Sequence, residues 1–220
     1  MDSNLSQNLD QLLGDLAPAE LSCGLEPSRA RLAALFGGAE NTIEPEQLVT
    51  FCTEYIRLVP RQATELEEIA RALKLRDIIE PYVGLAVNYL QSACDEISHS
   101  ETHETLEAFL ILLQGAYIFA RMQEELDDKV EAFIGAPVSH LNLMEANLIV
   151  HEIIGDNFAN RLDKVVESLI QQSKVSKSII EANLNKTQVD AARQGNQSLT
   201  GQCIESFAAR YGYSMTGGLL

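Results

Sequence analysis

The chain has no tryptophan, only six prolines among its 220 residues, and few aromatic residues, which make up 6% of its composition. The apolar residues are mainly Leu, Ile, Val and Ala. A β-sandwich would need more Thr, Tyr and Val in alternation, whereas aliphatic residues with little proline favour helices packed on helices. We therefore expect an all-α fold.

Closely spaced cysteines are also absent from the sequence. The four cysteines are far apart, and none forms a CxxC pair. Zinc fingers and dithiol redox sites need closely spaced cysteines, so neither is supported. Cys52 and Cys94 lie in helical patterns, where a free cysteine usually acts as a small buried apolar residue. Nothing indicates a disulfide framework, so we expect a reducing compartment and a cytoplasmic location.

From the sequence we expect neither a signal sequence nor a membrane span. The first 13 residues are not basic and have no apolar core. The longest apolar run, 108–122, contains Gln114 and Arg121 and is short for a bilayer crossing. We therefore expect no membrane association.

Positive charge is in deficit, with 16 Lys and Arg against 32 Asp and Glu, a net charge of −16. Such a chain repels phosphate backbones and anionic lipids, which argues against nucleic acid and membrane surfaces as partners. The imbalance lies in residues 1–172, whose net charge is −18, whereas residues 173–220 carry +2. We therefore expect an acidic helical domain over 1–172 and a polar C-terminal helical arm over 173–220.

Apolar residues recur with the helical period along most of the chain, and stop signals separate the segments. Pro60 is expected to separate two helices, and a polar break is expected at 98–104. The predicted helices span about 5–16, 26–37, 45–58, 64–75, 77–97, 102–134 and 141–172, with two more in the C-terminal arm.

The two longest predicted helices, 102–134 and 141–172, have a short connection and should form an antiparallel hairpin. The shorter N-terminal helices should cover this hairpin, and the C-terminal arm should pack on the domain or on a second subunit. Ile149 and Ile153 fall on the otherwise polar side of helix 141–172. Because an apolar residue on a polar face often marks a partner surface, we expect a homodimer.

One candidate metal site consists of Asp95, His99, His103 and Glu107, which are spaced four residues apart. On one continuous helix these four side chains would line a single face and could hold a divalent cation. However, the segment SHSETHET has the Ser and Thr content of a helix junction, which would break that register.

A second candidate is His151, in the stretch HEIIGDNFANR. On a single helix 141–172 it would lie in an apolar stripe beside Ile154 and Phe158, as a histidine in a helix interface. Four acids, Glu145, Glu152, Asp156 and Asp163, would then form a solvated acidic ridge on the opposite face.

The segment HEIIGDNF also resembles the phosphoacceptor box of histidine-kinase dimerisation domains, in which His, an acid and Gly recur. The resemblance covers about eight residues and implies that His151 is a phosphoacceptor and that Glu152 orients its imidazole for attack on a phosphoryl group. It is less similar to the H-x-L-K-G segment of phosphotransfer domains.

No other set of residues suggests catalysis, and no cofactor motif is present. We therefore expect a non-enzymatic interaction or regulatory protein with a protein partner, for which an acidic chain favours positive charge. There are two alternatives. One is histidine phosphotransfer through His151, and the other is metal binding through Asp95, His99, His103 and Glu107.

Overall fold

The computed structural model describes residues 3–35, 44–72, 76–99, 104–134 and 143–172, and every regular element in these ranges is a helix. The predicted all-α class is confirmed, while the C-terminal arm 173–220 and residue His103 lie outside the described residues. The eight helices are α1 (Ser3–Asp15), α2 (Pro18–Gly24), α3 (Glu26–Leu35), α4 (Pro45–Ala72), α5 (Arg76–His99), α6 (Thr105–Ile134), α7 (Met144–Ile154) and α8 (Asp156–Gln172).

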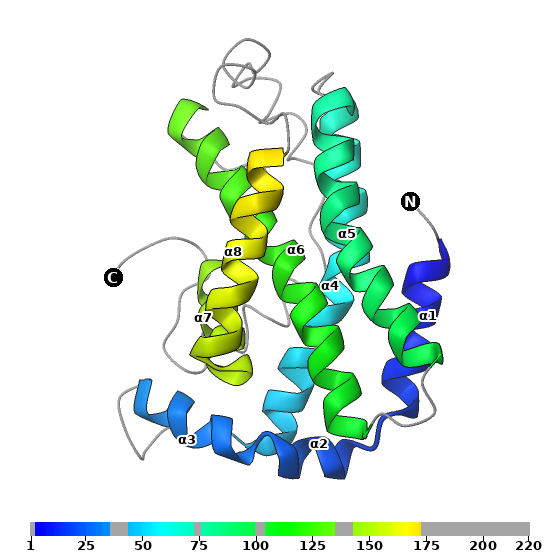
Figure 1. Ribbon diagram of the computed structural model, residues 1–220, viewed down its shortest axis with the longest axis vertical. Coiled ribbons are helices and arrows are strands. Elements are labelled where there is room, and N and C mark those ends of the chain that lie inside the picture. The colour runs from blue at the N-terminus through cyan, green and yellow to red at the C-terminus, as the bar shows by residue number, and fades with distance from the viewer. Residues whose placement is uncertain (1–2, 36–43, 73–75, 100–103, 135–142, 173–220) are drawn as a thin grey trace.

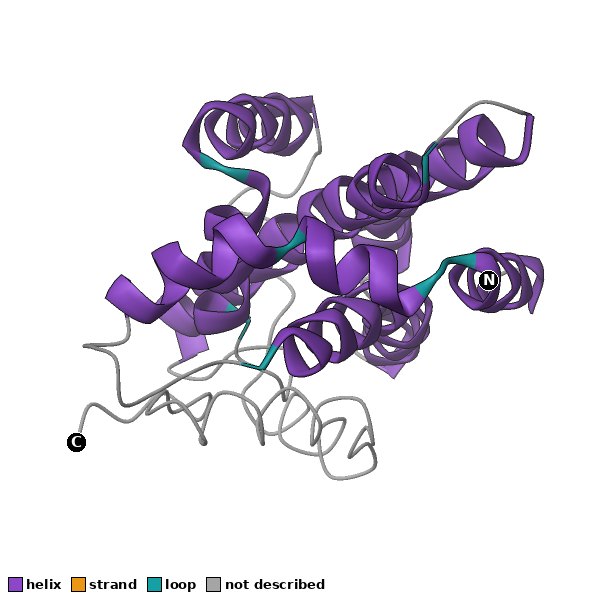
Figure 2. Ribbon diagram, turned by 90° about the horizontal axis from the view of Figure 1, so that it is seen from below, coloured by secondary structure: helices purple, strands orange, loops and turns teal. Residues whose placement is uncertain are grey.

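Three long helices form the centre of the fold, because α4, α5 and α6 all pack against one another (Figure 1). Helix α1 packs on α4 and α5 on one side, and α7 and α8 pack on α6 on the other side. The short helices α2 and α3 lie across one end of the molecule. In the view from below, the described residues form only helices and short loops (Figure 2).

Helix α4 runs through Pro60, so the predicted break between two helices at this position is wrong. A proline inside a helix removes one main-chain hydrogen bond and costs about 3 kcal/mol. Here Leu58, Val59 and Ala63 are all at most 1% exposed, so one continuous helix keeps apolar side chains on both sides of Pro60 buried. The tertiary packing of α4 offsets the local cost of the proline.

Helix α6 is the most enclosed element, and its contact with α5 is close. A Cβ atom on Gly115 would lie 3.0 Å from the Cα of Leu90, so the absence of a side chain allows the two backbones to approach. Across the same contact, the Tyr82 hydroxyl donates a hydrogen bond to the main-chain oxygen of Met122. Cys52 and Cys94 are buried as expected, at 0% and 1% exposure.

The stretch Thr105–Leu126 of α6 has the length and apolar composition of a membrane span, the single such stretch among the residues that the structure describes. In this fold, 61% of its most apolar part is buried inside the protein. Packing against α4, α5, α7 and α8 therefore accounts for its composition.

The predicted helix 141–172 is wrong as one element, because it is divided at Gly155 into α7 and α8. Gly155 has φ 82° and ψ 146°, a conformation that is accessible essentially to glycine alone. Its N–H donates to the His151 carbonyl at 2.8 Å, and its carbonyl accepts from Phe158 and Ala159 at 3.0 Å. One helix therefore ends and the next begins at a single residue, which we call the kink.

The kink changes which residues face the core. Ile149 and Ile153, predicted to form a partner surface, are buried at 0% and 5% exposure within the chain itself. Phe158, predicted to lie in the core stripe, is 53% exposed. The homodimer stays a prediction, but the two isoleucines from which it was inferred do not support it.

Candidate functional site

His151 lies in the last turn of α7 and contacts two other helices. Its Nδ1 is 3.4 Å from the hydroxyl oxygen of Tyr117 on α6, and its Nε2 is 3.2 Å from Oδ1 of Asp156 on α8. The Tyr117 hydroxyl donates its one hydrogen to Oδ1 of Asp163 at 3.1 Å. Both ring nitrogens of His151 therefore face acceptor oxygens, and the ring stays partly exposed, at 24% of its side chain.

The predicted acidic ridge opposite His151 is wrong for two of its members. Asp156 contacts the histidine itself, and Asp163 accepts hydrogen bonds from Tyr117 and, at 3.2 Å, from Nε of Arg121. The reason is the kink, because α8 starts with a new register after Gly155, which places Asp156 against His151 of α7 and Asp163 against α6.

These contacts continue into the centre of the bundle. Nη1 of Arg121 donates to Oε2 of Glu124, which also accepts from Nδ2 of Asn147 at 2.6 Å. Oδ1 of Asn147 accepts from the hydroxyl of Tyr55 on α4 at 2.7 Å. We call this connected set the polar network, and its members are Tyr55, Tyr117, Arg121, Glu124, Asn147, His151, Asp156 and Asp163.

Burial determines the protonation states inside the network. It raises the pKa of the Tyr55 hydroxyl well above its ordinary value, and burial together with the Asp163 carboxylate raises the pKa of Tyr117. For Arg121, burial lowers the pKa, but Glu124 and Asp163 raise it by more, so the guanidinium stays charged. Both tyrosines are therefore neutral hydrogen-bond donors at physiological pH, and not bases or nucleophiles.

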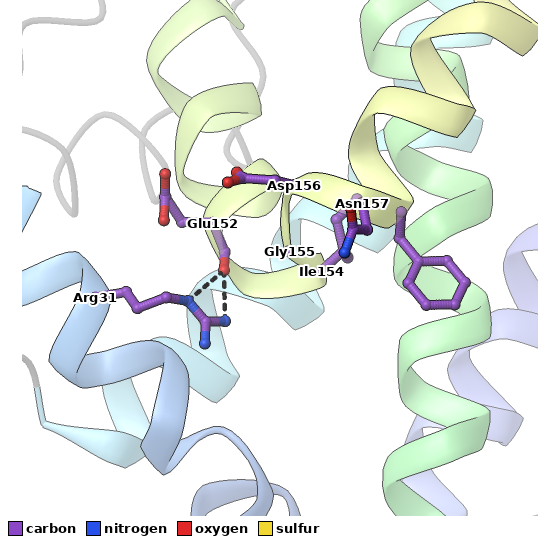
Figure 3. A pocket seen from close by; sticks show the side chains of 7 residues that line it. Arg31, Glu152, Ile154, Gly155, Asp156 and Asn157 are labelled. Carbon is purple, nitrogen blue, oxygen red and sulfur yellow. Dashed lines mark hydrogen bonds between the residues drawn. The ribbon is translucent and has the colours of Figure 1, made fainter.

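An open pocket of about 490 Å³ lies at the kink, on its outer side (Figure 3). Ile154 and Phe158 supply its apolar lining, and charged groups from α3, α7 and α8 supply much of the rest. We call it the kink pocket, and its lining residues are Arg31, Glu152, Ile154, Gly155, Asp156, Asn157 and Phe158.

Arg31 connects α3 to the C-terminal end of α7. Its Nε and Nη2 donate to the main-chain oxygen of Glu152 at 3.2 and 2.7 Å, as the dashed lines in Figure 3 show. The buried Ser28 hydroxyl donates to the next carbonyl, that of Ile153, at 3.4 Å. The last carbonyls of a helix lack partners within it and carry partial negative charge, so a guanidinium stabilises them.

The charge that the kink pocket presents is negative. Its lining contains two carboxylates, Glu152 and Asp156, and one cation, Arg31, whose guanidinium is engaged by a main-chain oxygen. A positively charged group of a ligand is therefore favoured in this pocket over an anionic one.

Exposed apolar side chains gather on the same two helices. Of the four large hydrophobic residues that are exposed in the described part of the chain, three lie on α7 and α8. Met144 is 48% exposed, Leu148 50% and Phe158 53%, while the fourth, Tyr89 on α5, is 38% exposed. Sequence reasoning missed this surface, because it assumed one continuous helix and placed Phe158 toward the core.

The candidate metal site of Asp95, His99, His103 and Glu107 required one continuous helix, and the chain is not one helix there. Helix α5 ends at His99, Glu104 is not helical, and α6 begins at Thr105, so Glu107 lies on a different helix from Asp95 and His99. Nδ1 of His99 is 2.6 Å from the main-chain oxygen of Asp95. Within the described ranges, which leave out His103, no three His, Cys, Asp or Glu side chains gather as they would around a metal ion.

The phosphoacceptor resemblance assigned the helper role to Glu152, but the structure places Asp156 beside His151. Glu152 instead lines the kink pocket, where its main-chain oxygen receives Arg31. The phosphoacceptor role of His151 stays a prediction, with a different acid next to the imidazole.

The chain matches no protein-family model, and comparisons with curated proteins and with solved structures found none that is similar. The described residues define an all-helical protein in which a polar network, buried at Tyr55, Tyr117 and Asn147, supports a kinked surface helix pair. A function must therefore be inferred from the chemistry of that surface.

Proposed function

We propose that this protein is a non-enzymatic interaction or regulatory protein that binds a protein partner on the α7–α8 surface, with the kink pocket at its centre. The observation that carries the proposal is the exposure of three large apolar side chains on these two helices, one of which, Phe158, lines an open pocket. Binding hot spots are commonly apolar or aromatic anchors in such pockets, surrounded by polar residues. Phe158 is such an aromatic residue, since it is exposed and lines the pocket.

Charge supports a basic partner. The chain has a net charge of −16, and Glu152 and Asp156 add two carboxylates to the pocket. A partner that presents an apolar side chain next to Lys or Arg would bury the first against Ile154 and Phe158. Its cation would lie near the two carboxylates, where opposite charge also accelerates encounter.

The polar network supports a structural role more than a catalytic one. Its tyrosines are neutral, its arginine is paired with two carboxylates, and both nitrogens of His151 have partners. A closed network of this kind holds α4, α6, α7 and α8 in one arrangement and so fixes the shape of the kink surface. We place the protein in the cytoplasm, which agrees with the free thiols of Cys23, Cys52 and Cys94.

The proposal is tested by affinity capture from the native cell extract with wild-type protein and three variants. Phe158→Ser and Leu148→Ser remove exposed apolar side chains of the α7–α8 surface, and Tyr89→Ser removes one from α5 as a matched control. A partner should be captured by wild type and Tyr89→Ser but not by Phe158→Ser. With the purified partner, loss of Phe158 should weaken binding by about 30-fold, as for a hot spot worth about 2 kcal/mol.

If all four proteins capture the same set with the same affinity, the α7–α8 surface is not the binding site. Circular dichroism of each variant checks that the fold is intact. Little change is expected, since the three altered side chains are exposed.

Histidine phosphotransfer is the second candidate, favoured by the contact between Asp156 and the partly exposed imidazole. A neighbouring carboxylate can orient a histidine for attack on phosphorus. Incubation with acetyl phosphate should then give an acid-labile phosphoryl group on wild type but not on His151→Ala. Equal labelling of the two proteins would exclude this role.

A further inference from the structure

A second buried polar group lies away from the polar network, between α4 and α6. It consists of Gln62 and Glu65 on α4 and Gln123 on α6, whose exposures are 1%, 7% and 1%. Nε2 of Gln123 donates to Oε1 of Gln62 at 3.0 Å, and Nε2 of Gln62 donates to Oε2 of Glu65 at 2.9 Å. We call these three residues the glutamine–glutamate cluster.

The cluster has too few donors. Oε1 of Glu65 and Oε1 of Gln123 are buried, and neither has a hydrogen-bond partner. An unpaired buried acceptor is unfavourable, because it has lost its hydrogen bonds to water and gained none in the protein. Both unpaired atoms are acceptors, so the group that the cluster lacks is a hydrogen-bond donor, and a proton on the Glu65 carboxyl would supply one.

The surroundings of Glu65 favour that proton. Burial raises the pKa of the Glu65 carboxyl, the amide of Gln62 lowers it, and the carboxylate of Glu68 on the same helix raises it, with a net upward shift. The α6 residue that bonds to the cluster is the neutral Gln123, which donates to Gln62.

Three charged or titratable groups of α5 and α6 near this contact bond to other residues. On α6, Arg121 and Glu124 bond to each other and to residues of α7 and α8. On α5, the Tyr82 hydroxyl donates to the main-chain oxygen of Met122, the residue before Gln123. In the described residues, no cation is paired with Glu65 to hold it in the charged form.

We propose that the glutamine–glutamate cluster is a proton-binding site that couples the packing of α4 on α6 to pH. The folded protein holds a proton on Glu65 under mildly acidic conditions in which exposed glutamates have lost theirs. Loss of that proton leaves a buried carboxylate, one of whose oxygens has no donor, between the two central helices and weakens their contact. This inference does not depend on the proposed function, since none of the three residues lines the kink pocket.

The direction of the pH effect follows from proton linkage. The pKa of Glu65 is higher in the folded state than in the unfolded state, so between the two values the folded protein binds more protons. The unfavourable contribution is absent below the unfolded value, grows as the pH rises toward the folded value, and is constant above it. Each unit of difference changes the folding equilibrium constant about tenfold.

The test uses urea unfolding of the full chain between pH 4 and pH 8, with wild type, Glu65→Gln and Glu96→Gln. Glutamine keeps the shape of glutamate and brings its own donor without a charge. Glu65→Gln should gain stability relative to wild type as the pH rises, while the two should converge at the acidic end. Glu96 is an exposed carboxylate on α5, so Glu96→Gln should follow the pH profile of wild type.

A parallel profile for wild type and Glu65→Gln over the whole range would overturn the proposal. A direct measurement covers the case in which Glu65→Gln does not fold. The carbon-13 NMR shift of the Glu65 carboxyl in wild type should titrate at a higher pH than those of exposed glutamates. Titration at or below their midpoint would also overturn the proposal.

Discussion

Helix α6 has two sides that are built from different interactions. Toward α5 the contact is close and apolar, with Gly115 against the backbone of Leu90, which is fully buried. Toward α7 and α8 the contact is polar, and Tyr117 and Arg121 of α6 bond to Asp163 of α8. One helix thus connects a side with close apolar packing, the apolar half, to a side where the polar network joins the apolar packing, the polar half.

The comparison shows how the two halves differ in what they specify. Apolar burial is non-directional and supplies most of the free energy of folding. Hydrogen bonds among buried groups add less net stability, but they require one geometry and penalise others. The apolar half therefore stabilises the bundle, and the polar half fixes the position of the kinked pair α7–α8 that carries the proposed binding surface.

The largest effect is expected from truncating leucines in the two halves. Leu90→Ala removes a fully buried side chain from the α5–α6 contact and should lower the free energy of unfolding by about 3 kcal/mol. Leu148→Ala on α7 removes a side chain that is 50% exposed and should cost less than about 1 kcal/mol. Urea unfolding measures both values, and equal losses would mean that the two halves do not differ as described.

A smaller effect is expected in the polar network. Asn147→Leu leaves the Tyr55 hydroxyl and the Glu124 carboxylate without this partner, and should cost about 2 kcal/mol. Tyr55→Phe removes the hydroxyl that donates a hydrogen bond to Asn147. The double variant should therefore lose less stability than the sum of the two single losses. Strict additivity in this double-mutant cycle would show that the two residues are not coupled.

The smallest effect is expected at the kink. Gly155→Ala forces a side chain into a conformation with φ 82°, and should cost about 1 kcal/mol or somewhat more. Gly84→Ala on α5 is the matched control, because a Cβ there meets no atom within 4 Å and alanine favours helix by up to about 1 kcal/mol. Thermal unfolding should therefore give shifts of opposite sign, and a stabilising Gly155→Ala would argue against the kink.

The local sequence was sufficient for much of the bundle. The expected helix 77–97 appears as Arg76–His99, and the expected helix 102–134 appears as Thr105–Ile134. These segments have a strong apolar period and polar residues at their ends, and such signals do not depend on distant partners. The burial of Cys52 and Cys94 followed from the same periodicity.

Two predictions of where a helix ends were wrong, one at a proline and one at a glycine. Pro60 was expected to end a helix, but packing keeps it inside α4. Gly155 was expected to be tolerated inside a helix, but it ends α7 and starts α8. In both cases the outcome depends on what the neighbouring residues bury, which a preference of the residue alone does not contain.

The candidate site was only partly accessible from the sequence. His151 attracted attention because of its neighbours HEIIGDNF, yet its contacts are with Tyr117, 34 residues earlier, and with Asp156 across the kink. Tyr55 and Asn147 are 92 residues apart and meet only in the folded bundle. No local spacing marks such pairs, so the polar network could not be predicted.

The sequence by itself determined that this protein is helical, acidic and built on long apolar helices, because composition and periodicity act through local propensity and through burial of one helix face. The tertiary structure alone decided where the helices bend, which acids turn inward and which apolar side chains stay exposed. These outcomes arise from competition among distant segments for the same buried space. The α7–α8 surface and the glutamine–glutamate cluster are both products of that competition.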